Sequence, residues 1–192
     1  KAVLKGAPIV TLFHGLEGSY HSPYIQGMMH TLSKNGYAVV VMHFRGCGEL
    51  MNRLPRAYHS GDTADAKAWL ESLATRYAQS ILYAVGFSLG GNMLLKLLGE
   101  LHDRSLLRAA VSVSAPMQLD ICADQMDRGF SKIYQKHLMK NLKSSLLNKY
   151  DVHDIFSIIK MDRDRVKKIK TFWEFDDVYT APIHGFDSAK DY

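Results

Sequence analysis

A serine between two glycines, in Gly86-Phe87-Ser88-Leu89-Gly90, is the pattern in this sequence with the clearest chemical meaning. The apolar run ILYAVGF that leads into it is typical of a buried strand, and GGNMLLKLLGEL after it is typical of a helix. A serine on such a strand-to-helix turn stands above the strand end, and small residues two before and two after it relieve crowding in the turn. We therefore expect Ser88 to be a catalytic nucleophile on a nucleophile elbow built with Gly86 and Gly90.

Attack by a serine on an ester places negative charge on the carbonyl oxygen, and two backbone N–H groups are needed to stabilise it. Leu89 directly follows the nucleophile at the helix start, so its N–H is the first predicted donor. The second donor should come from a loop after an earlier strand, and in HGLEGS (14–19) we assign it to Leu16. We interpret His14, which opens that loop, as a turn histidine hydrogen-bonded to the backbone.

The partners that such a serine needs are harder to find. A histidine must take its proton and an acid must orient that histidine, in the chain order serine, acid, histidine. Three downstream histidines have no strand before them: His102, His137 and His153. His184 follows Asp176 and Asp177 closely, but a crossover between neighbouring parallel strands needs about a dozen residues, more than this interval holds. We therefore expect neither the triad acid nor the triad histidine within this chain.

Short apolar runs that suit buried strands alternate with helical patterns in the first part of the chain. These runs cover residues 8–15, 37–44, 81–87 and 109–116. Strands that are apolar throughout and alternate with helices predict an α/β fold with a mostly parallel sheet and helices on both faces. Ser22-Pro23 should start the first helix and Asn35-Gly36 should end it, and Asp62 or Ser60 should cap the next helix.

After the last of these runs the pattern changes to helices alone. Tyr134, Leu138, Leu142 and Leu146 recur at four-residue steps, which predicts one apolar helix face. No linker or internal repeat marks a second domain. We predict a single domain over residues 1–192, with a helical cap-like insertion at about 117–180.

The positive charge is concentrated in that helical region. The chain carries a net charge of +5, and residues 131–170 hold eleven Lys or Arg against four Asp. Such a block can attract anionic lipid or an acidic partner, but we favour the simpler interpretation that these charges lie on solvated helix faces. No nucleic-acid-binding motif accompanies it, so we expect no nucleic acid partner.

Other sequence features exclude several classes of protein. No apolar run approaches the roughly 18 residues of a membrane-spanning helix. Cys47 and Cys122 form neither a disulfide framework nor a metal-binding spacing, which predicts a cytoplasmic protein. The histidines follow no metal-ligand spacing and RGCGE lacks the phosphate-loop lysine, so we predict no metal and no cofactor. The oligomeric state has no signature in the sequence.

The blocks HGLEGSYHSPYIQGMM, NRLPRAYHSGDT, YAVGFSLGGNMLLKLLGE and FWEFDDVYTAPIHGFDSAKDY resemble successive blocks of the YheT-type hydrolases (AB hydrolase 4 family). That family is a branch of the α/β-hydrolase superfamily, and the resemblance runs through nearly the whole chain. It implies the α/β-hydrolase fold and a serine hydrolase with carboxylesterase-like activity on acyl, lipid-like esters. It also implies that the strands bearing the acid and the histidine follow the last block, and that opening strands precede the first.

From this resemblance we expect residues 1–192 to be the central part of a larger hydrolase, with little or no turnover alone. Two other functions stay open on the sequence. The protein could transfer the acyl group to an alcohol or thiol instead of water. It could also be a non-catalytic hydrolase-fold module that binds a lipid or an anionic partner through residues 131–170.

Overall fold

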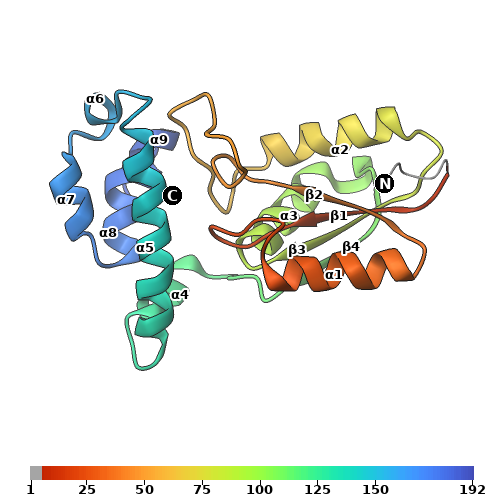
Figure 1. Ribbon diagram of the computed structural model, residues 1–192, viewed down its shortest axis with the longest axis horizontal. Coiled ribbons are helices and arrows are strands. Elements are labelled where there is room, and N and C mark those ends of the chain that lie inside the picture. The colour runs from red at the N-terminus through yellow and green to blue at the C-terminus, as the bar shows by residue number, and fades with distance from the viewer. Residues whose placement is uncertain (1–5) are drawn as a thin grey trace. The chain divides into compact units, whose positions relative to one another are not determined.

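The computed structural model describes residues 6–192, which form four parallel strands and a series of helices (Figure 1). The strands are β1 (Ile9–Phe13), β2 (Ala38–Met42), β3 (Leu82–Phe87) and β4 (Leu107–Val113). They form one sheet in the order β2-β1-β3-β4, with parallel pairing throughout. The predicted parallel α/β architecture is confirmed, although β4 begins earlier in the chain than its predicted range.

Three helices pack on this sheet and alternate with its strands: α1 (Pro23–Lys34), α2 (Ala64–Arg76) and α3 (Leu89–Leu101). Successive strand side chains point to opposite faces. Val10 and Leu12 therefore pack with Ile25 of α1, whereas Ile9 packs with Leu73 of α2. Figure 1 shows α1 and α2 on opposite sides of the sheet. Burial on both faces explains why β1 is apolar along nearly its whole length.

β4 departs from the prediction of strands covered on both faces. Val111 in this strand is 55% exposed, and Arg108 and Ala109 are exposed as well. β4 is an outer strand of the described sheet, so it has a hydrogen-bonded neighbour on one side only among residues 6–192.

The first helix begins and ends where the sequence predicts. Ser22 occupies the N-cap position with Pro23 after it, and Asn35 is the C-cap. Gly36 has a φ of 83°, a left-handed conformation that glycine adopts without steric cost. The Ser22 hydroxyl accepts from the Ser19 N–H rather than from the helix, so it stabilises the preceding loop.

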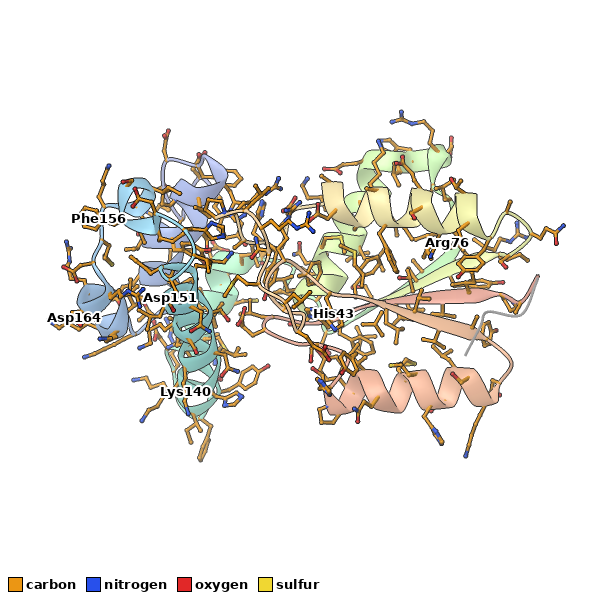
Figure 2. All side chains as sticks on the ribbon, turned by 45° about the horizontal axis from the view of Figure 1, so that its top comes forward. His43, Arg76, Lys140, Asp151, Phe156 and Asp164 are labelled. Atoms are coloured by element: carbon orange, nitrogen blue, oxygen red, sulfur yellow. The ribbon has the colours of Figure 1, made fainter. Side chains whose placement is uncertain are left out.

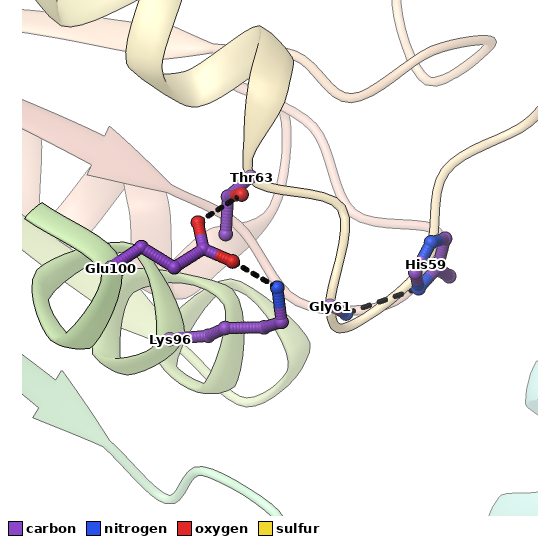
Figure 3. A network of polar contacts seen from close by, with 5 residues as sticks. All are labelled: His59, Gly61, Thr63, Lys96 and Glu100. Atoms are coloured by element: carbon purple, nitrogen blue, oxygen red, sulfur yellow. Dashed lines mark hydrogen bonds and ion pairs between the residues drawn. The ribbon is translucent and has the colours of Figure 1, made fainter.

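The cap predicted for α2 is wrong by one to three residues. Thr63 holds the N-cap position instead of Asp62 or Ser60, and its side chain does not cap the helix. The Thr63 hydroxyl instead donates to Glu100 Oε2 on α3, at 2.6 Å (Figure 3). Lys96 pairs with the other carboxylate oxygen, and this hydrogen bond holds the pKa of Glu100 below its usual range. The start of α2 is thus fixed by a contact between helices, which local sequence does not reveal.

The remaining elements are helical. They are η1 (His102–Arg104), α4 (Leu119–Met126), α5 (Ser131–Lys149), α6 (Ile155–Ile159), α7 (Arg163–Lys168), α8 (Phe172–Phe175), the π-helical turn η2 (Asp176–Thr180) and α9 (Ala181–His184). Contacts divide the chain into two compact units. The sheet unit comprises the chain up to Phe44 together with His59–Met117, and the helical unit comprises Arg45–Tyr58 together with Gln118–Tyr192. Cys47 and Cys122, both in the helical unit, are free thiols.

The longest helix, α5, buries most but not all of its predicted face. Leu138, Leu142 and Leu146 are buried, whereas Tyr134 is 58% exposed. A four-residue step overshoots one helical turn by about 40°, so three steps carry Tyr134 roughly 120° away from Leu146. At that level Gln135 is buried instead, and its amide donates to Asp127 Oδ1 at 2.6 Å.

A buried lysine ties α5 to the loop of residues 45–58. Lys149 is 3% exposed, and its Nζ donates to Asn52 Oδ1 at 2.7 Å. The same ammonium donates to the carbonyls of Pro55 and Arg56, at 3.3 Å each. Three oxygen acceptors offset the cost of burying this charge, so Lys149 holds the loop within the helical unit.

Among the helices of residues 6–192, none has the length and apolar character needed to cross a membrane.

Candidate active site

Ser88 lies on the turn between β3 and α3 in a strained backbone conformation. Its φ of 51° and ψ of −120° fall in a region that residues with a side chain rarely adopt. Its N–H donates to the Val113 carbonyl at 2.8 Å, and its carbonyl accepts from Gly91 and Asn92. These hydrogen bonds hold the Ser88 backbone in its strained conformation. The Ser88 hydroxyl itself makes no hydrogen bond to the described residues, so it remains available for an incoming substrate.

The two glycines of the elbow are required by the backbone around them. A Cβ at Gly86 would lie 2.4 Å from the Gly90 carbonyl oxygen, and a Cβ at Gly90 would lie 2.5 Å from the His14 carbonyl oxygen. The nearest atoms therefore belong to the start of α3 and to the chain at and just after the end of β1, so backbone atoms are the source of the crowding in the turn. Gly91 was not predicted, yet its Cβ would lie 2.6 Å from Ser112 Oγ.

His14 is held by backbone groups on both sides of its ring. It is fully buried, its Nδ1 lies 2.8 Å from the Gly15 carbonyl, and its Nε2 accepts from the Phe44 N–H at 3.2 Å. These partners assign the proton to Nδ1. Burial lowers the pKa of His14 to about 4, opposed by the Gly15 bond and assisted by His43. The interpretation as a backbone-bonded turn histidine is confirmed, and the Nε2 lone pair is not available to deprotonate a serine.

The loop of residues 14–19 makes a tight turn beside the elbow. Gly18 N–H donates to the Gly15 carbonyl at 3.0 Å, and Glu17 has a φ of 54°. A Cβ at Gly15 would lie 3.2 Å from Ser88 Cβ, so this loop touches the predicted nucleophile. The Leu16 N–H has no acceptor among residues 6–192, which leaves it free to face a substrate.

Leu89 is the first residue of α3, directly after Ser88. The first N–H groups of a helix have no intrahelical acceptor, and they carry the positive end of the helix dipole. Leu16 and Leu89 therefore lie on two segments that meet at Ser88, each at a position suited to donating to an anion. Their assignment as oxyanion donors stays a prediction.

Two aromatic side chains that accept hydrogen bonds from the backbone in and just after the loop of residues 14–19 were given no site role from the sequence. Tyr24, at the start of α1, accepts from the Gly15 N–H at 2.9 Å. His43, just after β2 (Figure 2), accepts from the Tyr20 N–H through Nε2 at 3.0 Å. Both look like ordinary helix-start or strand-end residues in the sequence, because their neighbours are brought in by the sheet.

The downstream acids and histidine have other partners within the helical unit. His184 Nδ1 lies 2.7 Å from the Thr180 carbonyl, so a backbone oxygen takes the proton that a triad acid would bind. Asp177 accepts from the Ala189 N–H at 2.7 Å. Burial raises the pKa of Asp176 to about 6, against a lowering bond from Thr180, and Asp177 raises it further. In the sheet unit, His102 follows the far end of α3, about 20 Å along the helix from Ser88.

Comparison with known proteins shows the family of this chain. A family model described as the alpha/beta hydrolase fold matches residues 8–152. The chain belongs to the α/β-hydrolase family. YheT of Escherichia coli (strain K12) is 42% identical over 185 residues, which are 96% of this chain and 54% of YheT. This similarity confirms the YheT-type resemblance seen in the sequence.

Two further proteins extend the comparison. Medium-chain fatty acid ethyl ester synthase/esterase 2 of Saccharomyces cerevisiae is 32% identical over 208 residues, covering 96% of this chain and 46% of the yeast protein. The chain thus spans about half the length of these relatives. The structure of esterase Pf2001 of Pyrococcus furiosus aligns with a TM-score of 0.51 and 21% identity, over 71% of this chain and 56% of Pf2001. That likeness concerns the fold alone.

Proposed function

We propose that this hydrolase cleaves carboxylic esters with acyl, lipid-like groups through an acyl-enzyme on Ser88. The observation that carries the proposal is the strained backbone of Ser88, with φ 51° and ψ −120°, on a strand-to-helix turn. Such strain persists only where the surroundings enforce it, and it is concentrated at functional sites. The esterase activity in the name of the yeast relative supports the same reaction class.

In the proposed reaction the Ser88 oxygen attacks the ester carbonyl carbon, and the charge that develops on the carbonyl oxygen is held by the N–H groups of Leu16 and Leu89. Collapse of this intermediate releases the alcohol and leaves the acyl group on Ser88, and water then releases the acid. The serine proton must pass to a histidine oriented by an acid. His14 is excluded from that role by its backbone bonds, and we place both triad partners outside residues 1–192.

The test is ester turnover by the longest native protein that contains this chain, with short- and medium-chain acyl esters and the Ser88→Ala variant. We expect Ser88→Ala to lose at least about a thousandfold in kcat, because the covalent route is removed. Retention of activity in this variant, with its folding checked by circular dichroism, would falsify the assignment.

Acyl transfer is the second candidate, because the name of the yeast relative includes both ester synthesis and ester hydrolysis. In that case an alcohol replaces water in the second step. Product analysis with added ethanol separates the two: transfer requires ester formation above the background of solvent alcoholysis, and hydrolysis alone yields only the free acid.

We also propose that residues 131–170 contact anionic lipid surfaces. On α5, Lys132, Lys136 and Lys140 are exposed at four-residue spacing, and Figure 2 shows Lys140 on this helix. Phe130 and Ile133 beside them are 92% and 71% exposed. Exposed apolar groups interleaved with lysines suit a bilayer interface with anionic headgroups.

Cosedimentation with vesicles tests this contact. We expect binding to phosphatidylglycerol-containing vesicles that falls with added salt and with the K132Q/K136Q/K140Q triple substitution. Equal binding to purely phosphatidylcholine vesicles, or no effect of the substitutions, argues against it. A cytoplasmic location is a further part of the proposal, which cell fractionation would check.

A further inference from the structure

The Tyr24 hydroxyl lies beside the predicted nucleophile. Tyr24 is the second residue of α1, and its Oη accepts from the Gly15 N–H at 2.9 Å. A Cβ placed on Gly15 would lie 3.2 Å from Ser88 Cβ and 3.4 Å from Tyr24 Oη. The serine side chain and the phenol oxygen therefore flank the same glycine.

Packing holds the phenol in this place. The rings of Tyr24 and Phe87 lie 4.9 Å apart between centroids, and Phe87 directly precedes Ser88. Tyr24 is 42% exposed, so the ring is fixed on one side and open to solvent on the other. A hydroxyl that is both positioned and accessible is suited to contact a bound ligand.

The Tyr24 hydroxyl accepts one hydrogen bond within the described residues but donates none. A phenol can accept through its lone pairs and donate one proton. Gly15 N–H occupies the acceptor side, and no acceptor among residues 6–192 takes the Tyr24 proton. Because the Gly15 N–H is bound to Tyr24, it cannot face a substrate itself. The phenol O–H can donate toward the site in place of the Gly15 N–H. Accepting the Gly15 hydrogen bond also polarises the phenol O–H and makes it a stronger donor.

We propose that Tyr24 donates its O–H to the oxyanion that forms when Ser88 attacks the ester, as a third donor beside the N–H groups of Leu16 and Leu89. This inference rests on the proposed function of Ser88. The proton stays on Tyr24 throughout, so the phenol acts as a hydrogen-bond donor and not as an acid. Such a donor acts on the transition state more than on the ground state, because the charge develops only there.

The first test compares Y24F with Y37F in the longest native protein that contains this chain. Tyr37 packs against Tyr83 at the opposite ends of the strands from Ser88, so Y37F is a matched loss of one phenol hydroxyl. For Y24F we expect kcat to fall about tenfold to a hundredfold with KM within about twofold. Affinity for an alkyl boronic acid, a mimic of the tetrahedral intermediate, should fall by the same factor as kcat/KM. Y37F should change neither quantity.

A second variant separates donation from a purely structural role as acceptor of the Gly15 N–H. Replacing Tyr24 with 3,5-difluorotyrosine keeps the ring and its oxygen but lets the phenol ionise near neutral pH. A phenolate still accepts from Gly15 but cannot donate, so we expect kcat to decline on the alkaline side where the natural enzyme does not. An unchanged pH profile overturns the inference, even if Y24F misfolds.

The outcomes also separate this inference from the proposed function. If Ser88→Ala abolishes turnover while Y24F leaves kcat and boronate affinity unchanged, Ser88 stands and the role of Tyr24 is wrong. If Ser88→Ala keeps its turnover, the proposed function fails and the role of Tyr24 fails with it.

Discussion

Gly90 shows how the elbow depends on backbone contacts at the scale of single residues. Its α-carbon faces the carbonyl oxygens of His14 and Phe13, which a Cβ would approach to 2.5 and 2.7 Å. Both oxygens belong to the end of β1 and its loop, so neither can move as a flexible side chain can. Gly90 therefore allows α3 to start close against β1, which places Leu89 and the loop of residues 14–19 on either side of Ser88.

The variant Gly90→Ala should lower the free energy of unfolding by about 3 kcal/mol or more, because the backbone must shift to accept the methyl group. Gly27 gives the matched control, since it lies in α1 and a Cβ there meets nothing within 4 Å. Gly27→Ala should stabilise the protein by about 0.5–1 kcal/mol. Urea unfolding of both variants checks this; similar small effects for both would contradict the argument.

At the scale of elements, Lys149 connects α5 to a loop that lies about a hundred residues earlier in the chain. Three oxygens of residues 52–56 surround its ammonium. His153 Nε2, four residues further on, also lies 3.3 Å from the Asn52 carbonyl. Within the loop, the Asn52 side-chain amide also donates to the Leu54 and Arg56 carbonyls. Residues 52–56 are therefore ordered both by contacts inside the loop and by α5.

Lys149→Met should therefore lower the free energy of unfolding by about 2–3 kcal/mol, since it removes three hydrogen bonds and leaves Asn52 Oδ1 without its donor. It should also expose residues 45–58 to limited proteolysis. Lys140→Met, on the exposed face of the same helix, should change stability by no more than about 0.5 kcal/mol. Equal protease resistance in the two variants would show that Lys149 does not hold the loop.

Local patterns in the sequence were sufficient to predict the strands and the first helix, but not the contacts between elements. The strands could be predicted because burial on both faces makes them apolar, and α1 because Ser22-Pro23 and Asn35-Gly36 act within a few residues. The Thr63–Glu100 and Lys149–Asn52 bonds join residues that are distant in sequence, and the Tyr24–Gly15 bond joins a helix start to the loop that follows β1. Each is formed only after the elements pack, so no local pattern could reveal it.

The candidate site divides in the same way. The G-x-S-x-G turn is a local motif, so Ser88 and its glycines could be located from sequence. The reason for Gly90 could not be found in this way, because the carbonyl oxygens that it avoids belong to Phe13 and His14, at the end of β1 and just after it. Tyr134 was misplaced on the buried face of α5 because the four-residue spacing was followed without the drift of 40° per step.

At the scale of the whole molecule, each unit carries a titratable group with a shifted pKa, the buried His14 and the half-buried Asp176, and the two have opposite effects on stability. In the sheet unit the pKa of His14 is lowered to about 4. Between pH 6.5 and 4 the unfolded chain therefore binds a proton that the native state does not bind. Its contribution to stability is lost as pH falls through that window. In the helical unit the pKa of Asp176 is raised to about 6, so its contribution is present below pH 3.8 and lost as pH rises through 6.

We therefore expect His14→Gln and Asp176→Asn to change the pH dependence of unfolding in opposite directions. Because of His14, the natural chain should lose stability on the order of 3 kcal/mol between pH 6.5 and 4, and His14→Gln should not show this loss. Because of Asp176, the natural chain should gain stability as pH falls from about 6 to 3.8, and Asp176→Asn should not show this gain. Denaturant unfolding at half-unit pH intervals measures both, and parallel pH profiles for the two variants and the natural chain would contradict the assignment.

The most direct test of the central claim is covalent labelling with a fluorophosphonate, which reacts with an activated serine. The longest native protein that contains this chain should be labelled at Ser88, located by peptide mass spectrometry, and Ser88→Ala should abolish the label. Residues 1–192 alone should be labelled weakly or not at all, because we propose that the triad histidine and acid lie outside them. Absence of label at Ser88 in the longer protein would contradict the assignment of Ser88 as the nucleophile, and strong labelling of the 192-residue chain would show that one of its own histidines activates the serine.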